Sequence, residues 1–417
     1  MAACRWLDAA GMSITRQCRT DPEARPRPFA PPHCPNRACD FFQPREEWSY
    51  RREGWLRSPA HPRRLQRFRC LHCKRKFSER TFETTYWLHR RRLFPQIAAL
   101  SVAGAGLRQI ARTFGISHST VARHLARAGR HCLLFHRQLL HASPNWEPIA
   151  FDGFETFEHS QFFPFHLNLA AGRSSWFLYH FTESPLRRKG RMTVEQRRQR
   201  AELEAALGRP DPKAVERGVF ELLRGLRRGS DWREDASNPS LRSSGDEGFS
   251  TSRPLPPQLH LHSDEHPAYR RAIRRLQDTD PGLRVRHDVT PSTAPRTTAN
   301  PLCAVNLADL LLRHCGANHR RETIAFSKRR QAAIERLAVF LVWRNAIKWR
   351  REKKPGETAA MRAGLVRRRL SWSDVFARRL FPRRNALPGV WWSYYWRKVR
   401  TAVLGSRQAR HTLKFAF

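Results

Sequence analysis

Three aspartates occupy positions from which their carboxylates could bind divalent cations together. Asp152 and Asp264 each end a short predicted strand, and Asp309 lies on a predicted helix that follows both of them. Carboxylate oxygens are the ligands that Mg²⁺ and Mn²⁺ prefer. Two such ions about 3.5 to 4 Å apart can activate a water or a 3′-hydroxyl and stabilise the leaving oxygen in phosphoryl transfer. These positions therefore predict metal-dependent phosphodiester chemistry.

Asp309 lies in a narrow polar strip of an otherwise apolar helix. The helix is expected over residues 300–316, because Asn300 is a suitable N-cap and a glycine follows the last turn. At about 100° per residue, Asn306, Asp309 and Arg313 share one side, and apolar residues cover most of the remainder. An i, i+4 pair with Arg313 would explain an exposed aspartate. An acid on so apolar a helix is better explained if it faces the sheet that carries the other two aspartates.

Each strand aspartate also has a simpler explanation. Asp152 could cap a turn before Gly153, and Asp264 could cap the helix that follows it. A second set of metal ligands is open as well, since His260, His262 and Asp264 alternate along one predicted strand and share a face. Such imidazoles would favour Zn²⁺ or Fe²⁺, although histidines on a half-buried strand more often pack or contact a phosphate backbone.

Two cysteine pairs near the N-terminus have the spacing of a zinc site. In chain order the four residues are Cys34, Cys39, Cys70 and Cys73. Four thiolates from two turns suit tetrahedral Zn²⁺, which lets a small module fold without a large core. His33 or His72 could replace one of the sulfurs. We therefore expect structural zinc in a ribbon-like module.

The segment from Leu107 to Leu125 predicts a helix-turn-helix. Apolar residues would anchor both helices, Gly115 permits the turn, and Ser117 is a suitable N-cap for the second helix. The second helix would lie in a major groove of DNA. The side chains expected to contact DNA are Arg108, Arg112, His118, Ser119, Arg123 and His124. A plain helical hairpin is the alternative, but the small-residue turn and the flanking arginines favour DNA reading.

The elements that must position the aspartates are strands with a period of two. The expected strands cover residues 149–152, 163–169, 176–181, 259–264 and 283–288, with a helix over 267–276. Residues 185–255 combine charged helical stretches with a Ser/Gly/Pro-rich linker, which indicates a partly disordered insertion. Three antiparallel strands followed by a helix between two further strands predict an RNase H-like mixed sheet, split by this insertion.

Composition indicates a nucleic-acid partner. The 417 residues carry a net charge of +42, from 78 Lys and Arg against 36 Asp and Glu, and the basic residues recur along the whole length. A polyanion such as double-stranded DNA is the expected partner. No apolar stretch approaches the ~18 residues of a membrane-spanning helix. The first residues also lack the apolar core of a secretory signal, so we expect a cytoplasmic protein.

Together these patterns predict a multidomain α+β protein. Its expected parts are a flexible leader (1–30), a zinc-binding ribbon (31–88), a helix-turn-helix DNA-binding domain (89–145), an RNase H-like catalytic domain (146–316) with the insertion 185–255, and a basic, aromatic-rich helical C-terminal region (317–417). In the last part, the aromatic cluster of residues 391–396 could either contact DNA or form a small core.

The order of these features resembles the transposases of small bacterial insertion sequences, in the DDE superfamily that also contains retroviral integrases. The resemblance covers about Cys34 to Lys348. It rests on the cysteine pairs, the helix-turn-helix, Phe151-Asp152-Gly153, Ser263-Asp264-Glu265 and the segment Arg-Glu-Thr-Ile-Ala-Phe-Ser-Lys at 321–328. It implies binding to terminal inverted repeats, metal-dependent strand cleavage and strand transfer. It also implies a homo-oligomer acting on element ends and target DNA in a bacterial cytoplasm, associated with the nucleoid.

The third acid departs from the pattern of that family. Related enzymes usually place a glutamate on the last catalytic helix, whereas this helix offers Asn306 and Asp309, and Glu322 lies beyond its end. The third ligand is therefore open between these residues. Two other functions also remain open, namely a sequence-specific DNA-binding regulator derived from a transposase and a metal-dependent nuclease without strand transfer.

Overall fold

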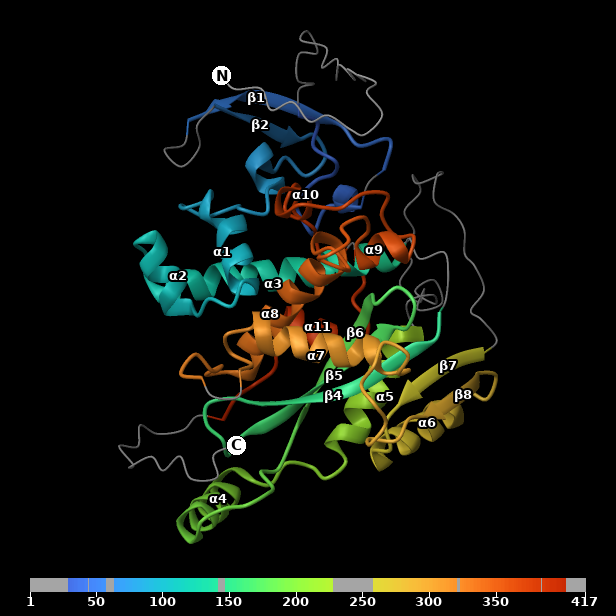
Figure 1. The fold of residues 1–417 in the computed structure, drawn as a ribbon. Helices are drawn as coiled ribbons and strands as arrows, with labels where there is room; N and C mark the ends of the chain where they lie inside the picture. Colours follow the sequence, from blue (N-terminus) through green and yellow to red (C-terminus); the bar gives the residue numbers. More distant parts are fainter. Residues whose placement is uncertain are drawn as a thin grey trace, which may run out of the picture.

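A computed structural model describes residues 29–43, 45–57, 64–141, 147–227, 258–320, 323–383 and 385–402. A small sheet lies at one end of the molecule, a layer of helices follows it, and a larger sheet lies beyond the helices (Figure 1). The predicted leader up to residue 28 and the part of the predicted insertion from residue 228 onward lie outside these ranges. Among the helices in these ranges, none is both long and apolar enough to span a membrane.

The small sheet carries the cysteines. Its strands β1 (Tyr50–Leu56), β2 (Leu65–Cys70) and β3 (Lys76–Ser78) pair in order and antiparallel, between the short turns η1 (Asp40–Phe42) and η2 (Glu79–Phe82). Its main buried cluster consists of Phe68, Phe77, Phe82 and three of the four cysteines, and Leu65 and Phe42 are buried as well. So small a core contains few aliphatic side chains, which makes a bound metal a plausible source of its stability.

Three helices follow the small sheet. They are α1 (Leu93–Val102), α2 (Leu107–Phe114) and α3 (His118–His141). The helix α3 extends far beyond Leu125, and its second half packs along α8 (Arg330–Val342). At Gly129 the two helices touch, because a Cβ there would meet the carbonyl oxygen of Glu335 at 2.3 Å. The helix-turn-helix is therefore continuous with the central helical layer.

The larger sheet has five strands in the order β6-β5-β4-β7-β8. Its strands are β4 (Ile149–Phe157), β5 (Pro164–Gly172), β6 (Leu178–Pro185), β7 (Gln258–Ser263) and β8 (Arg284–Val289). Neighbours among β4, β5 and β6 are antiparallel, whereas β7 is parallel to both β4 and β8. All five predicted strands are present, but β4 continues to Phe157, so Asp152 lies inside this strand and not at its end as predicted. The strand β6 begins two residues later than the alternation indicates.

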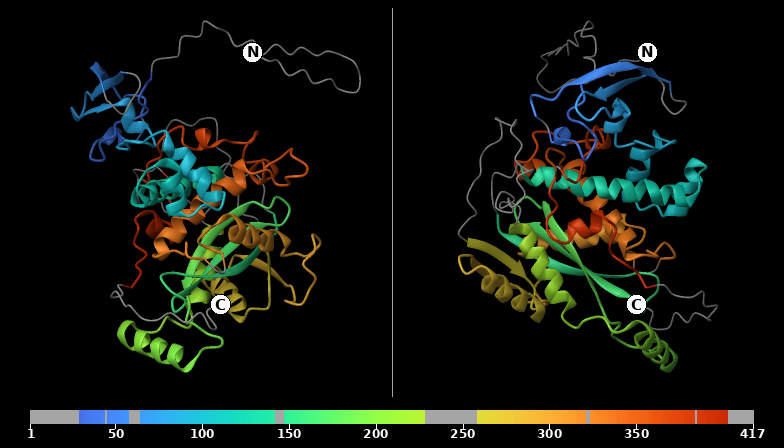
Figure 2. Two further views of the ribbon diagram at one scale, coloured as in Figure 1. Left: turned by 60° about the vertical axis from the view of Figure 1, so that its left-hand side comes forward. Right: turned by 180° about the vertical axis from the view of Figure 1, so that it is seen from behind.

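Helices cover both faces of this sheet. Ala150 packs in the cluster that contains α3, α7 (Cys303–Cys315) and α8, while its neighbour Phe151 packs in the cluster of α5 (Ala214–Arg227) and α6 (Pro267–Thr279). The helix α5 falls inside the range predicted as an insertion, yet it packs against β5, β6 and α6. Figure 2 shows that α4 (Val194–Leu207), by contrast, stands away from the sheet. Part of the predicted insertion therefore belongs to the core.

Helix α7 begins later than its sequence indicates. Its N-cap is Leu302, not Asn300. The side chain of Asn300 instead accepts a hydrogen bond from the backbone N of Leu302 at 2.8 Å, in a turn that precedes the helix. The predicted cap was wrong because an asparagine closes a turn of this kind by the same type of hydrogen bond.

The C-terminal region is part of the same core. After α8 come a π-helical turn (Trp343–Ile347), α9 (Ala359–Arg362), α10 (Trp372–Val375) and α11 (Trp391–Tyr395). Trp391 is fully buried and donates its indole N–H to the carbonyl oxygen of Phe181 at 2.8 Å. Of the two interpretations of the cluster at 391–396, burial supports a core role for Trp391 and Tyr394, while Trp392 and Trp396 remain partly exposed.

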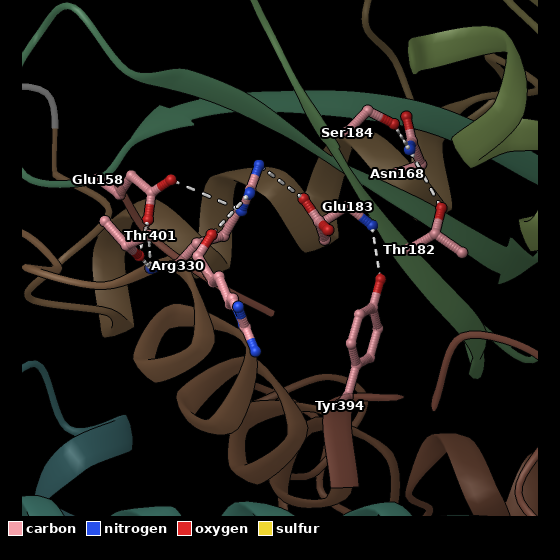
Figure 3. Close-up of polar contacts among 9 residues, drawn as sticks. Glu158, Asn168, Thr182, Glu183, Ser184, Arg330, Tyr394 and Thr401 are labelled. Carbon is pink, nitrogen blue, oxygen red and sulfur yellow. Dashed lines mark hydrogen bonds and ion pairs between the residues drawn. The ribbon is translucent and has the colours of Figure 1, made fainter. Parts of the chain in front are cut away.

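A buried charge network joins β4, β6 and α8 (Figure 3). The guanidinium of Arg330 lies 3.6 Å from the carboxylate of Glu158 and 3.2 Å from that of Glu183. Glu158 also accepts the backbone N–H of Arg330 at 2.6 Å and the hydroxyl of Thr401, and Tyr394 accepts the backbone N–H of Glu183 at 3.0 Å. The start of α8 and the segment from Tyr394 to Thr401, both more than a hundred residues after β6, are thus fixed to this sheet.

Buried neutral histidines make the fold sensitive to acid. Burial lowers the pKa of His136 to about 4, despite the hydrogen bond that its Nε2 donates to the carbonyl of Leu178 at 2.7 Å. A histidine with a lowered pKa stabilises the fold fully above its unfolded pKa of about 6.5, and this contribution is lost as the pH falls toward 4. Between pH 7.5 and pH 5, His136 alone should therefore account for about 2 kcal/mol of lost stability.

Chemical denaturation of the wild type and of His136→Gln at both pH values measures this contribution. Glutamine keeps an N–H donor for the Leu178 carbonyl but does not titrate. The wild type should lose about 2 kcal/mol more than the variant on acidification. An equal loss in the two proteins would show that His136 does not carry the effect.

Candidate functional site

The structure brings the three predicted aspartates to one region of the larger sheet. The parallel pairing of Ala150 with His262 places Asp152 on β4 beside the end of β7, which Asp264 follows. Helix α7, which carries Asp309, packs against β4 and β5. The charge of Asp264 raises the pKa of Asp152, and the charge of Asp152 raises that of Asp309. Asp152 therefore interacts electrostatically with both of the other carboxylates.

Burial makes these carboxylates poor places for unbalanced negative charge. It raises the pKa of Asp152 to about 6, although Oδ1 accepts hydrogen bonds from the N–H of Gly153 at 2.7 Å and from the hydroxyl of Tyr269 at 3.1 Å. Burial also raises the pKa of Asp309 well above its usual value. Oδ1 of Asp309 is buried and has no hydrogen-bond partner among the described residues. A cation would relieve both costs.

The simpler explanations of these acids are present but incomplete. Asp264 does cap the turn before α6, since its Oδ1 accepts from the backbone N of His266 at 2.9 Å. Arg313 lies over the ring of Phe154 at 4.3 Å and donates to the carbonyl of Glu155 at 3.3 Å. Its charge lowers the pKa of Asp309 only against the larger effect of burial. Capping and pairing therefore do not account for the buried carboxylate of Asp309.

The alternatives for the third ligand differ in what the structure says of them. Asn306 is half-buried and lies one turn before Asp309 on α7. Glu322 lies outside the described residues. Of these candidates, Asp309 is the one whose pKa is raised by the charge of Asp152.

Two residues near the acids escaped sequence reasoning. Tyr269 on α6 reaches Asp152 with its hydroxyl, and the charge of the exposed Arg296 lowers the pKa of both Asp152 and Asp309. Tyr269 could have been suspected, since it lies in the first turn of the helix that follows Asp264. Arg296 gave no signal, because only the fold brings the loop before α7 to the carboxylates.

The histidine pair on β7, His260 and His262, contacts Asp288 and not Asp264, the acid that the alternation along the strand indicates. His260 contacts Asp288 on β8 with 2.6 Å between Nε2 and Oδ2, and Nδ1 of His262 lies 3.9 Å from the same oxygen. The predicted set with Asp264 is therefore wrong, because the parallel strand β8 places Asp288 opposite His262. A guanidinium nitrogen of Arg173 lies 3.2 Å from Nε2 of His262. Its positive charge opposes a cation at this position.

The spacing of the ligand atoms separates the candidate metal sites. Within the described part of the chain, the cysteine quartet and the group of His260, His262 and Asp288 have ligand atoms that all lie within 4.8 Å of one another. The three aspartates are spread more widely than these two groups. They therefore do not form the closed ligand set of a single ion in this structure.

The four cysteines meet where the segment before η1, with Cys34 and Cys39, lies beside the turn between β2 and β3, with Cys70 and Cys73. Their sulfurs lie within 4.8 Å of one another, with 3.6 Å between those of Cys34 and Cys73. The indole N–H of Trp48 donates to the sulfur of Cys70 at 3.3 Å, and the backbone N–H of Asn36 donates to that of Cys34 at 3.4 Å. Such donors stabilise thiolates, and four convergent thiolates suit Zn²⁺.

Neither predicted substitute histidine joins the sulfurs. His33 is fully buried among phenylalanine rings, with 5.0 Å between its ring and that of Phe381, and its Nδ1 lies 2.9 Å from the carbonyl oxygen of Cys34. His72 points to Asp40, with 3.2 Å between Nε2 and Oδ2. The four-sulfur set is therefore the better ligand set.

The helix-turn-helix has the local geometry that its sequence indicates. Gly115 ends α2 with a positive φ of 58°, and the hydroxyl of Ser117 accepts from the backbone N of Thr120 at 3.2 Å. The side chains of the following residues are exposed as predicted: Arg108, Arg112, His118, Ser119 and Arg123. Residues around Gly115 line a shallow depression of about 500 Å³ at the junction of α2 and α3.

The prediction that His124 faces DNA is wrong. Its side chain is only 4% exposed, and its ring lies 5.9 Å from that of Phe94 on α1. Burial lowers its pKa. Arg127 is likewise engaged inside the protein, because it donates to the carbonyls of Thr84 and Tyr86. Within the helix-turn-helix, the exposed residues predicted to contact DNA therefore lie on α2 and the first turns of α3.

Comparison with known families supports this part of the molecule alone. Residues 95–128 match the family model of a helix-turn-helix domain, which covers most of α1, all of α2 and the first half of α3. No curated protein matches the chain. The match and the exposed residues together indicate a DNA-binding domain.

Proposed function

We propose that this protein is a DNA transposase of the DDE type, which binds terminal inverted repeats and catalyses metal-dependent strand cleavage and strand transfer. The observation that carries the proposal is that Asp152 lies close enough to Asp264 and Asp309 for their charges to interact, in a chain whose preceding residues 95–128 match a helix-turn-helix domain. A regulator needs only the DNA-binding part, whereas the buried carboxylates of Asp152 and Asp309 are costly unless they bind cations.

The strand order supports an RNase H-like catalytic domain. The antiparallel strands β6, β5 and β4 are followed in the sheet by β7 and β8, which are parallel to β4. Asp152 on β4 and Asp264, directly after β7, therefore belong to neighbouring strands. Helix α7 packs against β4 and β5 from one face. This arrangement lets residues more than a hundred positions apart form one acidic site.

In this proposal Asp152, Asp264 and Asp309 hold two Mg²⁺ or Mn²⁺ ions. When bound, the ions would activate the attacking hydroxyl and stabilise the leaving oxygen of the phosphodiester. Asp152 would be the ligand nearest to both other carboxylates, since its charge or theirs shifts the pKa within each pair. The hydroxyl of Tyr269 fixes the orientation of Asp152, and Arg296 is positioned to attract the phosphate backbone.

The proposal also assigns Zn²⁺ to the cysteine quartet as a structural ion. The four sulfurs converge from two turns, and donors from Trp48 and Asn36 are already directed at them. The ion would hold the small sheet together and would take no part in strand cleavage. We further propose that the protein acts as a homo-oligomer on element ends and target DNA, in a bacterial cytoplasm.

DNA reading by α3 is tested with Arg123→Ala. Arg123 is exposed on the second turn of α3, so its loss should weaken binding to a specific duplex by roughly 5- to 150-fold, as expected for a lost base contact. Arg274→Ala, an exposed arginine on α6, is the matched control and should bind normally. Fluorescence anisotropy at two salt concentrations measures both. Normal binding by Arg123→Ala would place recognition elsewhere in the chain.

The activity itself is tested on DNA that carries the sequences flanking the coding region. With Mn²⁺ the purified protein should nick the ends of this DNA and join them to a target duplex, and a chelator should stop both steps. Nicking without joined products would favour the nuclease. Specific binding without nicking would favour the regulator.

A further inference from the structure

One exposed aromatic residue lies directly before the helix-turn-helix. Trp87 is 74% exposed, more than any other tryptophan that the structure describes. It occupies the turn closed by the hydrogen bond from the backbone N of Leu88 to the carbonyl of Thr85 at 2.9 Å. Its φ is +66°, a backbone conformation that glycine adopts at far lower cost. A large apolar side chain that is both strained and exposed at a turn is unfavourable for the isolated protein.

Hydrogen bonds from neighbouring side chains fix the backbone of the turn that carries Trp87. Arg127 on α3 donates to the carbonyls of Thr84 and Tyr86, and Arg80 donates to that of Leu88 at 2.9 Å. The hydroxyl of Thr84 also donates to the carbonyl of Phe376 at 2.8 Å. The backbone that carries the indole is therefore fixed relative to α3, the helix that carries exposed residues predicted to contact DNA.

The surroundings of Trp87 are positively charged. His89, Arg90 and Arg92 follow it and are exposed, while Arg91 is paired with Glu83 at 2.8 Å. These residues lead directly into α1, which packs against α2 and α3 (Figure 1). An exposed aromatic ring with exposed arginines a few residues away in the chain complements a nucleic acid, because arginines attract phosphates and the ring can stack on a base.

We infer that Trp87 is an aromatic wedge that enters the DNA beside the site bound by the helix-turn-helix and unstacks a base step there. The inference rests on the DNA binding proposed above and adds a second, sequence-tolerant contact to it. Apolar side chains that enter a minor groove separate adjacent bases and bend the duplex. The turn held by these hydrogen bonds suits this role, since little backbone freedom is lost on binding.

The test uses a duplex selected from a random-sequence pool by the wild-type protein, with 2-aminopurine placed in turn at each position flanking the selected site. Wild-type protein should raise the fluorescence at one step, because an unstacked 2-aminopurine is brighter. Trp87→Ala should abolish this rise and weaken binding by about 5- to 100-fold, the range of a lost base–aromatic stack. Trp87→Phe should retain part of both effects. Trp55→Ala removes an exposed tryptophan from β1 and should change neither.

Each contrary result identifies what fails. If no duplex is selected, the proposed DNA reading fails, and the wedge fails with it. If Trp87→Ala binds the selected duplex and raises its fluorescence like the wild type, the wedge is overturned while DNA reading stands. If the variant instead changes the sedimentation mass of the protein and leaves the fluorescence unchanged, Trp87 contacts a second copy of the chain, and the wedge is again overturned.

Discussion

Asp152→Asn is expected to lower Mn²⁺-dependent strand cleavage by roughly a thousandfold or more, with DNA binding unchanged. A neutral amide holds a divalent cation poorly, and the catalytic contribution of such an ion is worth several kcal/mol. The variant should still accept the hydrogen bonds from Gly153 and Tyr269, so its shape is preserved. Gel assays of nicked strands, beside anisotropy for binding, measure the two properties separately.

The same variant should be at least as stable as the wild type without divalent ions. Burial and the charge of Asp264 raise the pKa of Asp152 to about 6, so the ionised carboxylate is unfavourable in the fold at pH 7. Excess Mn²⁺ should raise the melting temperature of the wild type and much less that of the variant. Loss of activity together with loss of stability would instead indicate a purely structural aspartate.

Asp264→Asn should lose cleavage in the same way, and Asp288→Asn is its matched control. Asp288 lies on the neighbouring strand and contacts His260, so it shares the sheet but not the proposed ions. If Asp288→Asn is inactive and Asp264→Asn is active, the centre of the chemistry is the histidine group. For the third ligand, Asp309→Asn should abolish cleavage, Asn306→Ala should only reduce it, and Glu322→Gln should have little effect.

Cys70→Ser is expected to release about one equivalent of zinc and to unfold the small sheet. Zinc binding and folding are coupled in modules whose core is too small to fold alone, and the free energy involved is about 10 to 16 kcal/mol for structural zinc. Cys70 ends β2 and accepts the indole N–H of Trp48, so loss of its thiolate breaks both the ligand set and this contact. A colorimetric zinc assay and near-ultraviolet circular dichroism give the two readouts.

The control for this experiment is Cys303→Ser. Cys303 lies at the start of α7, away from the quartet, so its substitution should leave both the zinc content and the spectrum unchanged. The larger sheet should remain folded in Cys70→Ser, because its core draws on other elements. Purified wild-type protein without stoichiometric zinc would contradict the zinc assignment.

Some features of this protein follow from short stretches of sequence alone. The strands appear where apolar residues alternate, the turn of the helix-turn-helix appears at Gly115, and the cysteine pairs meet as their spacing indicates. Each of these depends on interactions within a few residues or on a ligand geometry that spacing largely fixes. Asp264 follows the last residue of β7 as predicted, whereas Asp152 lies inside β4, which continues to Phe157.

Other features depended on which elements pack together. His124 satisfies the pattern of an exposed recognition residue, but α1 covers it, and Asp288 lies beside His262 only because β8 adds to the sheet in parallel. Helix α5 is charged enough to suggest an insertion, yet its apolar side chains complete the cover of β5 and β6. Burial, strand neighbours and the approach of Arg296 to the acids are set by contacts between segments far apart in the chain. No local pattern carries that information, so only the tertiary structure decided them.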